Sequence, residues 1–271
     1  MNVTKLYLAG KLDAAIDAAM ANVKSKPLDS SARVLLCDLF CFRGDYERAD
    51  KQLEVLSQQD PSSALGVALY RQLIRGAIAR RQFYQEGRLP EFLTEPSPIV
   101  RQHLEASISI REGDGARSTE LLVAAEEQRA ALSGTCGGTP FDDFRDWDDL
   151  TSCIFEVITP NGKYYWVPMD QVEQVELRPV KSPRDVLWRA ARMVVVGGLD
   201  GEVYLPSLYA GSETSDDDEL RCGRAADWIG AEGQFSQGVG MRTFMIGEEN
   251  RPLLELEEVR FLVSSENVDK S

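Results

Sequence analysis

The first half of the chain places its apolar residues at the spacing of α-helices. One predicted helix carries Ile16, Ala19 and Val23 on a single face, the step that lets a helix bury one stripe. Further along, Asp60 followed by Pro61 supplies a capping oxygen and a residue suited to the first helical position. The pattern predicts helices at residues 1–9, 12–24, 29–43, 46–56, 62–86, 99–111 and 116–132.

Part of this helical pattern repeats. Gly10 and Gly44 lie 34 residues apart, as do Pro27 and Pro61, and similar segments follow both glycines. Glycine, Ala and Pro recurring at that period are typical of tetratricopeptide helix pairs, which usually bind other proteins. No glycine occurs at position 78, so the repeat changes there and a longer helix is expected. We predict an all-α, tetratricopeptide-like repeat domain over residues 1–132.

Beyond residue 150 the periodicity changes to that of β-strands. Asn161 and Gly162 form a strong hairpin signal, because both tolerate a positive φ. One short helix is expected at residues 183–192. The expected strands are 153–158, 163–167, 172–180, 201–205, 241–246 and 253–263. The fold class is therefore α+β, with a smaller β-rich, barrel-like domain over residues 150–263 and a disordered tail at 264–271.

Residues 133–149 differ from both halves. Glycine and proline cluster first, and five aspartates then alternate with Phe141, Phe144 and Trp147. A phosphate-binding loop would need a lysine that is absent, and a calcium loop would need a different spacing of its acidic residues. We expect a solvated interdomain linker whose aromatic side chains dock on a neighbouring surface.

Charge excludes one class of partner. The chain has a net charge of −14. Residues 1–132 carry 17 basic and 18 acidic side chains, whereas residues 133–271 carry 13 and 26. The second half would repel a phosphate backbone, so no nucleic-acid binding is expected. No apolar run reaches eighteen residues and no secretion signal is evident, so no membrane partner is expected. Five cysteines without a CxxC pair suit a reducing compartment, the cytoplasm.

Candidate chemistry is sparse. The single histidine, His103, lies in a predicted helix, where a structural role is expected, and one histidine cannot build a multi-histidine metal site. No catalytic motif is recognised, and no cofactor or metal is expected. The alternative is a hydrolase-like enzyme or a small-ligand-binding protein. Its site would be built from Arg184, Asp185, Arg224 and Asp227. The same four residues are equally explained as ion pairs between loops.

The second half is also rich in aromatic residues. In a small β-domain such side chains supply much of the buried area, so a core role is expected, with a recognition pocket as the alternative. The residues concerned are Trp166, Trp188, Tyr204, Tyr209 and Trp228.

Several ordered segments together resemble one family. They are the Gly44 to Ala49 segment, Trp166-Val167-Pro168, the Pro183 to Arg189 segment, the Gly201 to Tyr209 segment and the Gly223 to Trp228 segment. They resemble the ImpE family, also called TagJ, of bacterial type VI secretion. Cys222 and Ala226 stand where that family would have Leu and Thr.

This resemblance implies a cytoplasmic, non-enzymatic adaptor that binds the N-terminal helix of the small contractile-sheath subunit. It also implies an indirect link to the AAA+ ATPase that recycles the sheath.

A tetratricopeptide-like packing would expose one inner face for such a helix. The groove could instead lie at the domain junction or on the β-domain, and Val34 and Leu65 could simply be core. A structural oligomer with a two-fold interface is a third hypothesis. The predicted partner-binding residues are Val34, Asp38, Cys41, Leu65, Ala68, Gln72 and Arg75.

Overall fold

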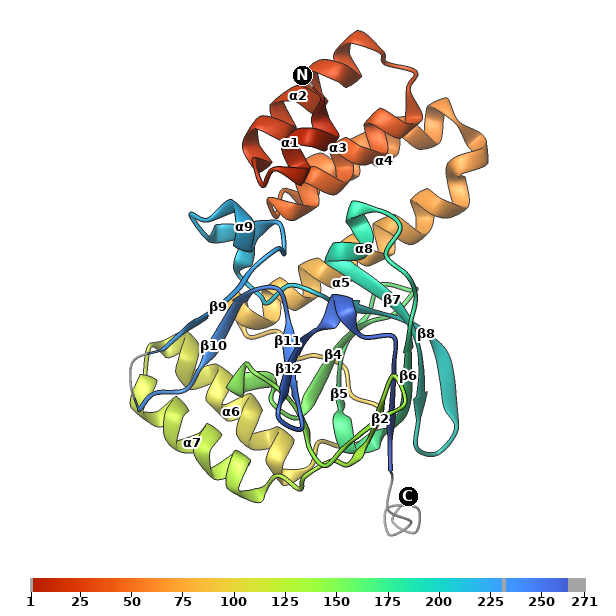
Figure 1. Cartoon of the computed structure of the whole chain (residues 1–271). Helices are drawn as coiled ribbons and strands as arrows, with labels where there is room; N and C mark the ends of the chain where they lie inside the picture. The colour runs from red at the N-terminus through yellow and green to blue at the C-terminus, as the bar shows by residue number, and fades with distance from the viewer. Residues whose placement is uncertain (1, 231–232, 263–271) are drawn as a thin grey trace.

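The computed structural model describes residues 2–230 and 233–262. Its N-terminal half is a layer of helices, and a strand-rich part follows (Figure 1). The helices of the first half are α1 (Val3–Leu8), α2 (Leu12–Ser25), α3 (Ser30–Phe42), α4 (Tyr46–Gln59), α5 (Ala64–Glu86), α6 (Pro98–Glu112) and α7 (Gly115–Gln128).

The predicted helices are all present, with ends shifted by a few residues. Side-chain oxygens of Asp29, Asp45 and Ser97 accept from the first free amides of α3, α4 and α6, as expected for N-caps. Gly44 has a φ of +72° and makes the sharp turn between α3 and α4. The tetratricopeptide assignment stays a prediction, because the long α5 follows after only two similar turns.

The strand-rich part contains three antiparallel sheets. Its strands are β1 (Gly134–Cys136), β2 (Thr139–Phe141), β3 (Phe144–Asp146), β4 (Ile154–Ile158), β5 (Tyr164–Pro168), β6 (Val172–Leu177), β7 (Trp188–Val195), β8 (Leu199–Pro206), β9 (Ala226–Ile229), β10 (Gln237–Gly240), β11 (Thr243–Ile246), β12 (Glu249–Pro252) and β13 (Glu258–Phe261). The main sheet has the order β2-β1-β13-β6-β7-β8-β4-β5, while β12-β11-β3 and β10-β9 form smaller sheets.

The prediction of a barrel-like domain is wrong. The main sheet stays open because its end strands, β2 and β5, do not pair with each other. The free edge of β5 is instead covered by the loop after α5. There the amide of Glu91 donates to the Tyr164 carbonyl at 2.8 Å, and the amide of Trp166 donates to the Glu91 carbonyl at 3.1 Å. A covered edge no longer needs closure.

Residues 133–149 do not form the solvated linker expected from their composition. They supply β1, β2 and β3, and β1 pairs with β13 of the main sheet. Phe144 is fully buried and stacks against Phe244, with ring centroids 5.0 Å apart. Asp143, Asp146 and Asp149 pair with arginines. Asp148 accepts from main-chain amides, so much of the charge of this segment is compensated where it folds into the core.

Two other predicted elements differ in extent. The helix expected at residues 183–192 is shorter, α8 (Pro183–Leu187), and the chain continues directly as β7. The Asn161-Gly162 hairpin is confirmed as β4 and β5. The last predicted hairpin is present only as β11 and β12, because β13 pairs with β1 and β6. The predicted tail at 264–271 lies outside the described residues.

The two faces of β4 contribute to two different hydrophobic cores. Ile154 and Ile158 pack into the core that also holds the helices, whereas Phe155 and Val157 belong to the core on the opposite face. This alternation follows from the two-residue period of a strand. Glu156 therefore lies on the helix-facing side. In the described part of the chain no helix has the length and apolarity needed to cross a membrane.

Candidate functional site

A cluster of buried charged residues is centred on Glu156 of β4. Five donors converge on its two carboxylate oxygens, although the side chain has no exposed surface. Arg80 of α5 donates twice, at 2.9 and 2.6 Å, and Tyr84 of α5 donates at 3.1 Å. The Tyr164 hydroxyl and the Arg242 guanidinium complete the set. This cluster joins the helical layer to the sheet.

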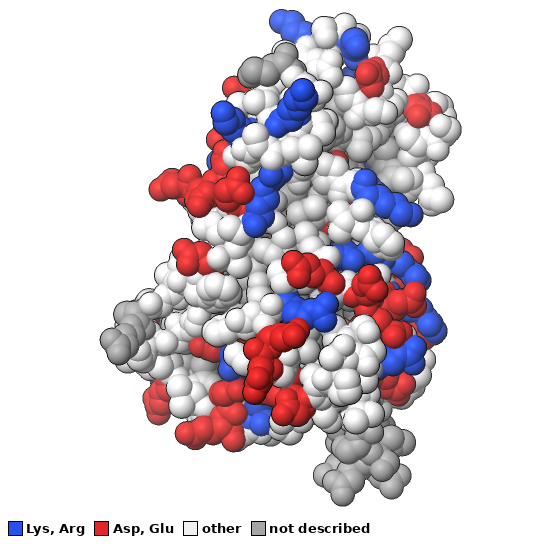
Figure 2. Space-filling view, viewed as in Figure 1, with Lys and Arg blue, Asp and Glu red and all other residues white. Residues whose placement is uncertain are grey.

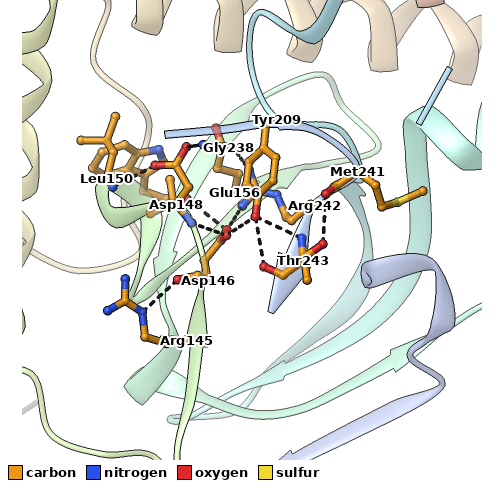
Figure 3. A network of polar contacts seen from close by, with 12 residues as sticks. Arg145, Asp146, Asp148, Leu150, Glu156, Tyr209, Gly238, Met241, Arg242 and Thr243 are labelled. Atoms are coloured by element: carbon orange, nitrogen blue, oxygen red, sulfur yellow. Dashed lines mark hydrogen bonds and ion pairs between the residues drawn. The ribbon is translucent and has the colours of Figure 1, made fainter. Parts of the chain in front are cut away.

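Arg242 extends the cluster to two buried aspartates (Figure 3). Its guanidinium donates to Asp146 at 2.7 Å, and the Tyr209 hydroxyl donates to the same carboxylate at 2.8 Å. Asp148 accepts from the amides of Leu150 and Gly238 at 2.9 and 3.0 Å. The three acidic residues thus tie β3, β4, β10 and the start of β11 together.

The pKa shifts in this cluster reflect the balance between burial, which raises the pKa of each carboxyl, and the neighbouring arginines, which lower it. Burial alone would raise the pKa of Glu156, but Arg80 and Arg242 outweigh it and lower that pKa to about 2. Burial, reinforced by the charge of Asp146, raises the pKa of Asp148 to about 7. Burial also raises the pKa of Asp146. Perturbed carboxylates can mark active sites.

The geometry of this cluster is that of a buried ion-pair network that joins secondary-structure elements. The side chains of Asp146 and Glu156 have no exposed surface, and their oxygens already accept hydrogen bonds from the protein. The carboxylate oxygens are therefore already occupied, and the Arg242 Nε, which has no hydrogen-bond partner, belongs to a side chain only 2% exposed. Among the residues described, no group of His, Cys, Asp and Glu is arranged to hold a metal ion.

His103 has the structural role expected from the sequence. It is 1% exposed, and its Nδ1 lies 3.0 Å from the Leu150 carbonyl oxygen. Its Nε2 lies 3.4 Å from the Cys153 thiol. Burial lowers the pKa of His103 to about 4 and raises that of Cys153 to about 12. Both groups are therefore neutral near pH 7, and the pair lacks the thiolate that a cysteine nucleophile needs.

The alternative ligand site is not assembled. Asp185 caps α8 by accepting from the Ser182 amide at 2.8 Å, and Arg184 lies over the Tyr70 ring at 4.9 Å. Arg224 donates to main-chain carbonyls at the end of α1, while Asp227 is exposed and accepts from the next amide. In the described part of the chain, each of these four residues is therefore engaged with a different partner rather than with the other three.

Most of the candidate aromatic residues are core. Trp166, Trp188, Tyr204 and Tyr209 are all buried. Trp228 is the exception, because it is 38% exposed.

The predicted partner-binding residues do not form one exposed face, because another segment of the chain covers those on α3. Asp38 and Cys41 of α3 are each 2% exposed, and the Tyr70 hydroxyl donates to Asp38 at 2.6 Å. The segment formed by α8 and Trp188 packs over this place, with the Trp188 ring 6.0 Å from that of Tyr70. No local signal in the sequence indicates this contact, because α8 lies about 145 residues further along the chain.

The start of α5 remains open, whereas the side-chain oxygen of Gln72 is buried near the turn at Gly162. Leu65 is 85% exposed, Ala68 and Arg75 are also exposed, and Gln72 and Val34 are half-buried. The four α5 residues follow one another at helical spacing, so they form one stripe, which we call the α5 stripe. An exposed leucine on a helix is the apolar contact that a partner helix would use.

Comparisons with known proteins agree with the family resemblance. Residues 138–260 match the family model described as ImpE protein. The chain is 29% identical over 261 residues to the type VI secretion system accessory component TagJ of Pseudomonas aeruginosa, covering 96% of this chain and 91% of that protein. A crystal structure of a Vibrio parahaemolyticus protein has a TM-score of 0.89 and 26% identity, covering 98% of this chain and 99% of that one. The predicted resemblance is confirmed.

Proposed function

Because the chain carries an ImpE family domain at residues 138–260, we propose that it is an accessory protein of type VI secretion. The observation that supports this role is the similarity to TagJ along 96% of the chain. In this role the protein acts in the cytoplasm by binding, without a chemical step of its own.

The proposed partner is the N-terminal helix of the small contractile-sheath subunit, and the proposed site is the α5 stripe. A partner helix would place its apolar face on Leu65 and Ala68 and meet the polar rim at Gln72 and Arg75. Leu65 is 85% exposed in the free protein, so a partner can remove most of its surface from water. Fully burying a leucine contributes about 1.5–3 kcal/mol.

The test is a calorimetric titration with a synthetic peptide of that sheath helix. We expect saturable binding that weakens about tenfold or more in Leu65→Asp, since apolar burial is lost and a charge is desolvated. Leu89→Asp is a matched control, because Leu89 is 67% exposed and lies in the loop after α5. It should bind like the wild type.

Two outcomes would contradict this proposal at different levels. Binding that is indifferent to Leu65→Asp would move the site to the domain junction or the sheet while keeping the adaptor role. No binding up to about 1 mM would leave less than roughly 4 kcal/mol of affinity, and the sheath-helix partner would be withdrawn.

A further inference from the structure

A small pocket lies where the helical layer meets the strand-rich part of the protein. Helices α4, α5 and α6 contribute residues to it, and so do β7, β10 and the 3-10 helix η4 (Ser212–Thr214). Its volume is about 180 Å³, below the roughly 300 Å³ at which pockets for drug-sized molecules begin. This pocket, which we call the junction pocket, therefore suits a small ligand. It shares no residue with the α5 stripe.

Arg81 of α5 brings a positive charge with free donors to the junction pocket. Its guanidinium lies 4.9 Å from the centroid of the Tyr46 ring, and one nitrogen donates to the Gly44 carbonyl at 3.1 Å. In the described part of the chain its other N–H groups have no hydrogen-bond partner, and they are not buried, so solvent reaches them. A half-buried arginine in this state can donate to a carboxylate from solution.

Glu213 of η4 brings a negative charge to the same pocket. The side chain is half-buried and packs against Gly44, the residue whose carbonyl accepts from Arg81. Nevertheless, within residues 2–230 and 233–262, Glu213 forms no ion pair with Arg81 or with any other side chain. The pocket therefore holds two opposite charges that do not neutralise each other.

The Tyr46 hydroxyl lies within the influence of both charges. Burial raises the pKa of Tyr46, Glu213 raises it further, and Arg80 and Arg81 lower it. This hydroxyl and the Gln237 amide have no hydrogen-bond partner among the residues that the structure describes, and solvent reaches both. Both can therefore bind a ligand.

The rest of the junction pocket is neutral or apolar. Arg80 donates to both oxygens of Glu156, so its charge is already compensated. Ile110 and the Tyr84 ring are half-buried and give the pocket an accessible apolar wall. A few convergent polar groups beside apolar surface are the usual composition of a small-molecule site.

Two opposite charges favour a ligand that carries both signs. A simple anion would satisfy Arg81 but be repelled by Glu213 and by the acidic run at residues 216–219. That run follows η4 and lies at the surface beside α9 (Asp218–Arg221) (Figure 2). A simple cation would satisfy Glu213 but be repelled by Arg81. A zwitterion meets neither penalty.

We propose that the junction pocket binds a free α-amino acid with a short apolar side chain. Its carboxylate would accept from Arg81, its ammonium would donate to Glu213, and its side chain would pack on Ile110 and the Tyr84 ring. Because α5, η4 and β10 all line the pocket, the bound amino acid would connect the helical layer to the strand-rich part. Binding would therefore raise the stability of the folded chain.

The first test is thermal unfolding of the full-length protein with L-alanine, L-valine or L-leucine. We expect at least one of them, at about 10 mM, to raise Tm by about 2–4 °C. Each amino acid is compared with two analogues, one without the ammonium and one without the carboxylate. For valine these are 3-methylbutanoate and isobutylamine, and both should bind at least tenfold more weakly than valine in calorimetric titrations.

Charge-neutral variants locate the site. Glu213→Gln keeps the size of the side chain and should weaken binding of the amino acid about tenfold or more. The same variant should bind 3-methylbutanoate more tightly than the wild type does, because the repulsion of an anion is removed. Arg81→Gln should show the reverse preference and gain affinity for isobutylamine. A general distortion of the pocket would not produce opposite changes for two analogues.

The matched control is Asp216→Asn. Asp216 is an exposed acidic residue three positions beyond Glu213 and does not line the pocket, so this variant should bind like the wild type. Circular dichroism checks that all variants are folded.

Three results would overturn the proposal. They are no change of Tm with any of the three amino acids, equal affinity of the wild type for an amino acid and its analogue without the ammonium, and equal weakening by Glu213→Gln and Asp216→Asn. None of these measurements uses the sheath-helix peptide, so either proposal can fail without the other.

Discussion

The Glu156 cluster predicts that one buried carboxylate holds the helical layer on the sheet. In Glu156→Gln the side chain keeps its size but loses the negative charge that Arg80 and Arg242 share. It also offers a single acceptor oxygen where five donors now converge. The arginines would then lie buried beside an amide that donates rather than accepts.

The pKa of Glu156 sets the size of this effect. Its pKa falls from 4.5 to about 2 on folding, which corresponds to about 3 kcal/mol of stability. Breaking a buried ion pair by removing one partner costs a similar amount, about 3–5 kcal/mol. Because the folded-state pKa is depressed, this stabilisation is present above about pH 4.5 and is lost as the pH falls toward about 2.

Urea unfolding followed by tryptophan fluorescence measures this difference. The fully buried Trp166 donates to the Tyr164 hydroxyl beside Glu156, so it reports on this place. At pH 7 we expect Glu156→Gln to be less stable than the wild type by about 3 kcal/mol. The gap should shrink by about half near pH 3.

A surface pair provides the control for this measurement. Glu47→Gln removes the exposed ion pair with Lys51 and should cause no resolvable change. A loss below about 1 kcal/mol at pH 7, or a gap that does not change with pH, would refute the view that Glu156 is a charged tie.

Two further predictions concern helix packing and pH. Gly76→Ala should destabilise the protein by about 1–3 kcal/mol, because a Cβ there would lie 2.4 Å from the Ile158 side chain. Gly66 lies in the same helix with open space around it, so Gly66→Ala should instead stabilise the protein by up to about 1 kcal/mol. Thermal unfolding distinguishes the two variants, and an equal change of Tm in both would contradict the close approach of α5 to β4. Burial raises the pKa of Asp38 to about 7, so this carboxyl contributes a loss of stability on the order of 2–4 kcal/mol as the pH rises from about 4 to about 7. Asp148, whose pKa is also about 7, contributes a loss of its own, so Asp38→Asn should lose about 2–4 kcal/mol less than the wild type over this range. Urea midpoints that change equally with pH in both proteins would contradict this.

Local signals allowed the helices and the first hairpin to be predicted from the sequence. The apolar period and the capping residue Asp60 lie within a few positions of the helix ends they define. Asn161 and Gly162 likewise form the turn that they predict. In each case the residues that decide the structure are neighbours in the chain.

The buried cluster could not be predicted in this way. Asp146 is neutralised by Arg242, 96 residues further along, and Glu156 by Arg80, 76 residues earlier. From composition alone the aspartates of residues 133–149 therefore resembled a solvated linker. The one available signal was Glu156 itself, a charged residue inside a strand of otherwise apolar residues.

The candidate partner face shows the same limit. Helical spacing correctly grouped Leu65 with Ala68 on one exposed stripe. It could not show that α8 and Trp188 pack over Asp38 and Cys41, because that contact joins distant parts of the chain. The exposed residues of the candidate face therefore lie mainly on α5.

The most direct test of an adaptor that binds its partner on the α5 stripe is hydrogen exchange of the full chain with and without the sheath-helix peptide. The account predicts slowed exchange of amides at residues 64–75, with the sheet unchanged, because the partner helix would cover the exposed first turns of α5. Slowed exchange confined to β4, β5, β7 or β8, or none at saturating peptide, would contradict it.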